Sequence, residues 1–261
     1  MKSVYSTFIL LLLFTLASCE KVIQPDLKNE KPQLVIEGEV SNQGPACRIS
    51  ISMSSSFNEA GNFNGVTDAV VKVSDNLGNS ETLPMQSPGI YQSTILSGIP
   101  GRTYFLNVSY DGKEYTSVCK MPSSVSIDTL FQMTQIANGN TRRFLIPAYT
   151  DPISESNYYR LKVYSNGKPI SKIFVRKDYL TNGINVTQPV GPFLSEFVPT
   201  DTATVCLMGI DKSIYEYFNG LEQTLNGSSS APANPVSNIS GGCLGYFSAH
   251  SKSEKKIKII D

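Results

Sequence analysis

The chain contains a single histidine, His250, so any catalysis or metal binding through imidazole must use this residue. Ser-His-Asp and Cys-His nucleophilic sites both need a histidine as the base. The Gly-x-Ser-x-Gly elbow that presents a serine nucleophile in one large class of hydrolases does not occur. His250 stands in a polar stretch, Ser-Ala-His-Ser-Lys. We therefore predict a solvated side chain that takes no part in catalysis or in zinc binding.

Paired carboxylates are the next chemistry to consider, because two of them about 5–9 Å apart can hydrolyse a glycosidic bond. Glu37, Glu39, Asp151 and Glu155 are candidates, but the sequence does not pair them. Glu37 and Glu39 share one face of a predicted strand, where charged side chains are usually solvated. A carboxylate-based hydrolase is thus a remote alternative, and we predict that the chain is not an enzyme.

Motifs for ions, cofactors and nucleic acids are weak or missing. The segment from Asp75 to Asn79 vaguely resembles a calcium loop but lacks the distal glutamate of an EF-hand, so a hairpin turn explains it better. There is no phosphate loop, no dinucleotide glycine fingerprint and no basic stretch interleaved with aromatic residues. The formal net charge is +0. We predict no metal, no cofactor and no nucleic-acid partner.

The leader segment predicts covalent chemistry at Cys19. Lys2 is followed by an uncharged, apolar run that ends in Leu16-Ala17-Ser18-Cys19, which resembles a bacterial lipobox. In such signals the peptide is cut before the cysteine, which then carries lipid. The apolar run is shorter than the ~20 residues of a membrane-spanning helix. We predict a signal peptide over residues 1–18, lipidation of Cys19 and a polar tether over residues 19–32; a transmembrane anchor and a soluble secreted product are the alternatives.

The four other cysteines, Cys47, Cys119, Cys206 and Cys243, form an even set, as in an exported protein with two disulfides. Proximity along the chain favours the pairs Cys47–Cys119 and Cys206–Cys243. Four buried free thiols are the alternative, because cysteine is a common small apolar core residue.

Residues 33–122 alternate between apolar and polar side chains with a period of two, the pattern of half-buried antiparallel strands. Turn residues separate these runs, and Asp111-Gly112 is typical of a type I′ hairpin. About seven short strands in this range predict a β-sandwich of immunoglobulin or transthyretin type.

Residues 123–261 predict a second, β-rich domain with one short helix. The hairpin signal Asn166-Gly167 lies within it. The helix is expected near residues 213–226, with Ser213 and Glu216 as a capping box and an aromatic stripe packed on the edge of the second sheet. The predicted strands cover residues 127–136, 143–149, 158–164, 170–176, 202–210, 243–249 and 256–260.

A long irregular loop is expected after the helix, over residues 227–238, and loops of that length are often functional. Next to it, Asn238, Gly241 and Gly242 form the candidate functional loop of the sequence. The glycines equally fit a tight turn with close packing, and both interpretations stay open.

Several segments in order resemble one known family. They read Leu-Val-Ile-Glu-Gly at residues 34–38, Gly-Ile-Pro-Gly-Arg-Thr-Tyr at 98–104, Asn-Tyr-Tyr-Arg-Leu at 157–161 and Gly-Tyr-Phe-Ser-Ala at 245–249. Over residues 19–250 this succession resembles the bacterial lipoprotein family called domain of unknown function (DUF) 4249. Cys243 departs from the family pattern, and this departure favours a bond with Cys206.

The resemblance implies an outer-membrane lipoprotein of a Gram-negative cell, similar to accessory partners of TonB-dependent transporters. It carries over no catalytic residue. Glu20, directly after the lipidation site, fits sorting to the outer membrane, and the leaflet stays open. We expect a non-enzymatic binding or accessory module that helps a transporter capture a nutrient of unidentified chemistry; a structural or adhesive cell-surface protein is the alternative.

Overall fold

The computed structural model describes residues 31–43, 46–55, 64–153, 156–178, 181–193, 195–225 and 235–261. The predicted signal peptide, Cys19, most of the tether, Glu155 and most of the loop after the helix lie outside these ranges. Within the ranges, no helix is long and apolar enough to cross a membrane.

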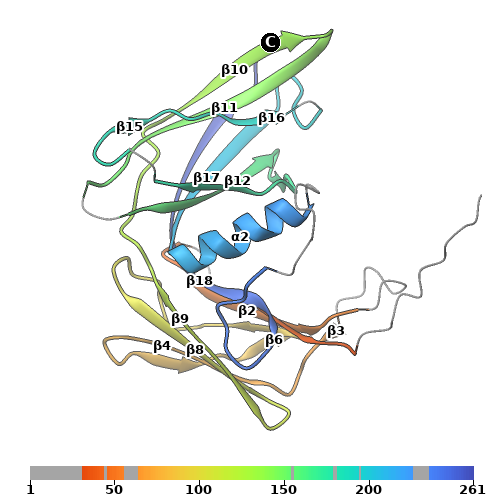
Figure 1. The fold of residues 1–261 in the computed structure, drawn as a ribbon, viewed down its shortest axis with the longest axis vertical. Helices are drawn as coiled ribbons and strands as arrows, with labels where there is room; N and C mark the ends of the chain where they lie inside the picture. The colour runs from red at the N-terminus through yellow and green to blue at the C-terminus, as the bar shows by residue number, and fades with distance from the viewer. Residues whose placement is uncertain are drawn as a thin grey trace, which may run out of the picture.

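The described chain is mainly β, as predicted, with three sheets and one helix, α2 (Figure 1). Nearly all neighbouring strands are antiparallel, and the pair β1–β18 is parallel. The largest sheet has the order β13-β12-β17-β18-β1-β2-β7-β6, with β14 and β3 as side branches. Strands from both ends of the sequence therefore share one sheet.

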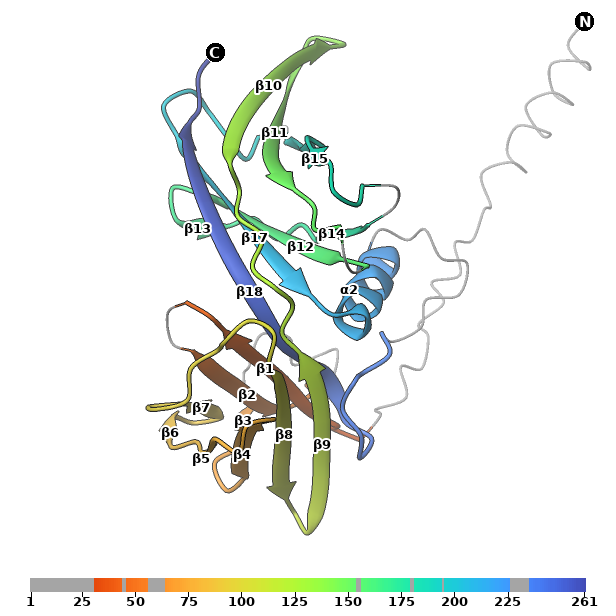
Figure 2. The ribbon, with the colours of Figure 1, turned by 90° about the vertical axis from the view of Figure 1, so that its left-hand side faces the viewer.

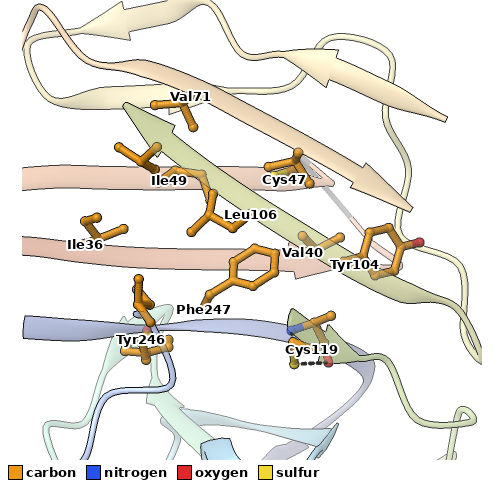
Figure 3. Close-up of a cluster of buried hydrophobic side chains, with 14 of the residues drawn as sticks. Ile36, Val40, Cys47, Ile49, Val71, Tyr104, Leu106, Cys119, Tyr246 and Phe247 are labelled. Carbon is orange, nitrogen blue, oxygen red and sulfur yellow. Dashed lines mark hydrogen bonds between the residues drawn. The ribbon is translucent and has the colours of Figure 1, made fainter. Parts of the chain in front are cut away.

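The first unit is a sandwich, as predicted, but it is not made of residues 33–122 alone, because β18 from the end of the sequence is part of one of its layers. One layer has the order β5-β4-β8-β9 and faces the β18-β1-β2-β7 part of the large sheet. Fully buried side chains from both layers meet between them, among them Ile36, Ile49, Val71, Leu106 and Phe247 (Figure 3). The strands are β1 (Leu34–Ser41), β2 (Cys47–Met53), β3 (Asn64–Gly65), β4 (Val70–Asp75), β5 (Ser80–Thr82), β6 (Met85–Ser87), β7 (Ile90–Gln92), β8 (Thr103–Tyr110) and β9 (Lys113–Lys120).

The second unit packs the β10–β11 layer against the β12-β17-β18 part of the large sheet. Its core contains Leu145, Leu161, Phe193, Val205 and Leu207, each at most 1% exposed. The strands are β10 (Thr129–Ala137), β11 (Asn140–Thr150), β12 (Tyr158–Ser165), β13 (Lys168–Pro169), β14 (Phe174–Lys177), β15 (Asn185–Val186), β16 (Val190–Phe193), β17 (Thr202–Ile210) and β18 (Leu244–Lys258).

Strand β18 joins the two units, and here the sequence prediction was wrong in detail. Two separate strands were expected at residues 243–249 and 256–260, but one strand runs from Leu244 to Lys258 (Figure 2). Its first half pairs with β1, up to Ser41 opposite His250, and its second half pairs with β17. The polar stretch in the middle lacks the apolar alternation that marks a strand in sequence, because its side chains lie against other polar groups.

Helix α2 (Lys212–Leu225) lies against β12, β14 and β18 near the junction (Figure 1). Its buried residues are Ile214 and Phe218, so the apolar stripe packs as expected. The predicted capping box is not formed. Instead, one Asp211 carboxylate oxygen, Oδ1, accepts hydrogen bonds from the Ile214 backbone N–H at 3.0 Å and from the Ser213 hydroxyl at 2.8 Å. Asp211 is therefore the N-cap.

The predicted turns are confirmed. Asp111-Gly112 joins β8 to β9 and Asn166-Gly167 joins β12 to β13, all four with positive φ as a type I′ hairpin requires.

The segment that begins at Asp75 is also a hairpin turn, between β4 and β5. The Asp75 carboxylate accepts hydrogen bonds from the backbone N–H groups of Leu77 and Asn79 and pairs with Arg102 at 2.6 Å. Burial alone would raise the pKa of Asp75, but the hydrogen bonds from Asn79 and Arg102 outweigh it and lower the pKa to about 2. This carboxylate is occupied by its own turn.

Candidate functional site

A polar cluster lies on one face of the large sheet, where the two units share β18. Side chains alternate along each strand, so Glu39 of β1, His250 of β18 and Lys162 of β12 point to the same side. The alternate residues of these strands pack into the two apolar cores. Pairing of β1 with β18, β18 with β17 and β17 with β12 brings these distant parts of the sequence together.

Glu39 is the centre of this cluster. Its Oε1 lies 3.1 Å from Lys162 Nζ, 3.7 Å from Arg160 Nη1 and 3.1 Å from the Tyr246 hydroxyl, which donates to it. Burial alone would raise the pKa of Glu39, but His250, Lys162 and Arg160 outweigh it and lower the pKa to about 2. The carboxylate is charged at neutral pH and balanced by two cations.

Aromatic side chains hold Arg160 in place. Its guanidinium carbon lies 3.5 Å from the centre of the Phe218 ring, a cation–π contact. Phe218 packs edge-on against Tyr246, with ring centres 4.9 Å apart. Helix α2 thereby positions one of the two cations that balance Glu39.

His250 corrects the prediction of a solvated side chain, because it is 2% exposed. Its Nδ1 lies 3.3 Å from the Ser248 hydroxyl. Burial lowers the pKa of His250, Glu39 raises it, and Lys162, with other nearby cations, lowers it further; the result is about 4. The imidazole is therefore neutral at pH 7, and its polar sequence neighbours gave no sign of this burial.

A cavity of about 230 Å³ opens beside His250. Its lining includes the carboxylate of Glu39 and the cations Arg48, Lys162 and Lys252. With His250 neutral, three positive charges face one negative charge. This cavity is the candidate functional site.

The loop after β1 fixes one wall of the cavity to β18. The Asn42 side-chain oxygen accepts from the Lys252 backbone N–H at 2.8 Å, and the Gln43 side-chain amide donates to the Lys252 carbonyl at 2.9 Å. Lys252 itself pairs with Glu254 at 2.6 Å. The wall is thus ordered by contacts within the protein.

Asp151 and Glu39 do not form a catalytic pair across this cavity. Asp151 is fully buried and accepts a hydrogen bond from the Tyr159 hydroxyl. Burial raises the pKa of Asp151. Tyr159 and Arg160 point to opposite faces of β12, so Asp151 and Glu39 lie on opposite sides of the sheet. Within the described ranges, no group of three or more His, Cys, Asp or Glu side chains could hold a metal ion.

The predicted disulfide Cys206–Cys243 is not formed, and both cysteines are buried free thiols. Cys206 pairs with Glu254 near the far end of β18, whereas Cys243 directly precedes the first residue of that strand. At ~3.3 Å per residue along β18 the two backbones are roughly 36 Å apart. A disulfide needs Cα atoms within about 7 Å.

The predicted disulfide Cys47–Cys119 is also not formed. Cys47 lies opposite Val40 on β1, and Val40 lies opposite Ala249 on β18. Cys119 instead contacts Ala249, whose backbone N–H donates to the sulfur at 3.1 Å. The Cys119 thiol in turn donates to the Asp211 carboxylate at 3.1 Å. Cys119 therefore links β9, β18 and the start of α2 as a thiol.

The candidate loop packs as a structural turn. The Asn238 side chain makes two hydrogen bonds with the Phe247 backbone, at 2.8 and 2.9 Å. A Cβ atom on Gly241 would lie 2.7 Å from the Glu114 carbonyl oxygen, and Gly241 and Gly242 both have positive φ. These contacts fit the alternative of a tight turn with close packing.

The cavity cations Arg48, Lys162 and Lys252 were missed in the sequence. Strand alternation correctly places Arg48 on the face opposite the core, but it does not reveal which distant strand faces it. The order of the strands in the large sheet, which no local pattern encodes, is the missing information.

The fold defines a two-unit, mainly β protein with a charged cavity at the junction. The chain belongs to the family described as Domain of unknown function (DUF4249), whose profile matches residues 20–256. The resemblance found in the sequence is thereby confirmed at the level of the family. No curated protein matches the chain.

Proposed function

We propose that this protein is a lipid-anchored, non-enzymatic binding module of the outer membrane that assists a TonB-dependent transporter in capturing a nutrient. The observation that carries the binding role is the cavity at the junction of the two units, whose charged lining is ordered by contacts within the protein. Preorganised polar groups in a cavity are typical of small-molecule sites.

The state of the titratable groups supports binding over catalysis. The Glu39 carboxylate is already paired with Lys162 and Arg160 and has a pKa of about 2, so it is a poor general base. His250 is neutral and buried, and its Nδ1 contacts a serine hydroxyl that lies on the same strand. Asp151 lies behind the sheet, away from the cavity.

The membrane role rests on the lipobox that ends in Cys19. Labelling of native cells with radioactive palmitate should mark the wild-type chain in the outer-membrane fraction. The variant Cys19→Ser should lose the label and leave the membrane. A labelled Cys19→Ser chain would exclude this cysteine as the lipidation site.

The transport role is tested by deleting the gene and measuring growth and uptake across a panel of nutrients. We expect reduced uptake of one nutrient class, restored by the wild-type chain and not by Cys19→Ser. Normal uptake with reduced attachment to surfaces would contradict the proposal and favour the structural or adhesive alternative.

A further inference from the structure

We infer that the junction cavity binds a small, hydroxylated organic acid through its carboxylate. This inference rests on the proposed binding function and adds the chemical class of the ligand. Its basis is an excess of positive charge in the cavity, together with one cation that has no partner among the described residues.

The excess of positive charge remains when the charged groups next to the cavity are also counted. Arg48, Lys162 and Lys252 face Glu39 in the lining, which leaves an excess of two positive charges. The ion-pair partners just outside the lining, Arg160 and Glu254, add one charge of each sign and leave the excess unchanged. A concave site with a net charge of one sign concentrates ligands of the opposite sign.

Arg48 is the group that a ligand would engage first. Lys162 is paired with Glu39 and Lys252 with Glu254, at 3.1 and 2.6 Å. Among the described residues, no hydrogen bond or ion pair is found for the Arg48 side chain, although it lines the cavity. A guanidinium presents two parallel N–H donors that match a carboxylate.

The rest of the lining and the size favour a small ligand with hydroxyl groups. The hydroxyls of Ser41 and Tyr164, the Gln43 amide and the neutral His250 ring provide hydrogen-bonding groups around the cations. The volume of about 230 Å³ lies below the ~300–1,000 Å³ of sites for drug-sized molecules. A six-carbon polyhydroxy acid is of the right scale and chemistry.

A matched series of linear six-carbon probes isolates the charge. D-Glucitol has no carboxylate, D-gluconate has one and D-glucarate has two. We would titrate each probe into the detergent-solubilised full chain by calorimetry at low and high salt. Affinity should rise from glucitol to gluconate to glucarate, and high salt should weaken the two acids and leave glucitol unchanged.

Two variants locate the site. Arg48→Gln should weaken glucarate binding by about tenfold or more, the usual effect of losing a charge-assisted hydrogen bond. The control Lys72→Gln removes the same charge from an exposed position on β4, in the opposite layer, and should leave the affinity unchanged.

Four results would overturn the inference. The first three are no binding of either acid at 10 mM (about ten times a 1 mM Kd), equal binding of glucitol, and equal loss in the two variants. The fourth is binding of inorganic phosphate in place of the acids, which would overturn the carboxylate class. The titration needs no transporter, so it can fail while the uptake defect of the deletion strain still supports the accessory function.

Discussion

Replacing His250 with glutamine should remove a pH-dependent part of the stability of the fold. His250 is the only histidine of the chain, and it is buried beside Glu39, Lys162, Arg160 and Lys252. Its pKa is lowered from 6.5 to about 4 in the folded protein. As the pH falls below 6.5, the unfolded chain binds a proton that the folded protein excludes, so stability decreases.

The size of the effect follows from the pKa difference. Each pKa unit corresponds to about 1.36 kcal/mol. Above pH 6.5, His250 does not lower the free energy of unfolding. Protonation of His250 in the unfolded chain lowers the free energy of unfolding by about 2 kcal/mol at pH 5 and by about 3 kcal/mol near pH 4. The carboxyl groups whose pKa values are lowered, Glu39 and Asp75 among them, lose their own stabilisation at lower pH. A comparison of pH 7 with pH 5 therefore reports mainly on His250.

The assay is urea unfolding of wild type and His250→Gln at both pH values, followed by circular dichroism because the chain has no tryptophan. The wild type should lose about 2 kcal/mol more than the variant between pH 7 and pH 5. The carboxyl groups Asp151 and Glu222, whose pKa values burial raises, are present in both proteins and cancel in the comparison. An equal loss in both proteins would refute the buried, neutral state of His250.

Three further predictions concern the fold. Gly245 and Gly242 both have positive φ, but a Cβ atom on Gly245 would overlap the Ile36 carbonyl oxygen, whereas one on Gly242 meets no atom within 4 Å. Gly245→Ala should therefore lower the urea midpoint of unfolding much more than Gly242→Ala does. Equal shifts would contradict the close approach of β18 to β1. Asp211→Ala should lower the free energy of unfolding by about 1 kcal/mol in the same assay, as loss of an N-cap does, and by more than Ser213→Ala. The reverse order would contradict Asp211 as the N-cap and support the capping box predicted from the sequence. The four described cysteines are free and buried, and burial raises the pKa of each thiol. Ellman's reagent should therefore detect no reactive thiol among them in the native protein and all four after denaturation. If they formed two disulfides, the reagent would detect none of the four in either state.

The sequence predicted local structure well, because local structure depends on neighbouring residues. The sequence located β17 at Thr202–Ile210, and Asp-Gly and Asn-Gly marked two hairpins. The same rules failed in the middle of β18, where a polar stretch forms a strand because β17 pairs with it and the polar cluster surrounds it.

The site could not be predicted, because it depends on strand order. Glu39 and Lys162 are more than a hundred residues apart in sequence and meet at 3.1 Å only through the path β1-β18-β17-β12. The burial of His250 and the free state of the cysteines follow from the same order, which local patterns do not contain.

The most direct test of the proposed function is purification of the lipidated protein from its native outer membrane in mild detergent, with quantitative mass spectrometry of what accompanies it. We predict a TonB-dependent transporter in near-equal molar amount, lost when Cys19→Ser replaces the wild type. Recovery of the protein alone, from membranes that contain such transporters, would contradict the accessory role.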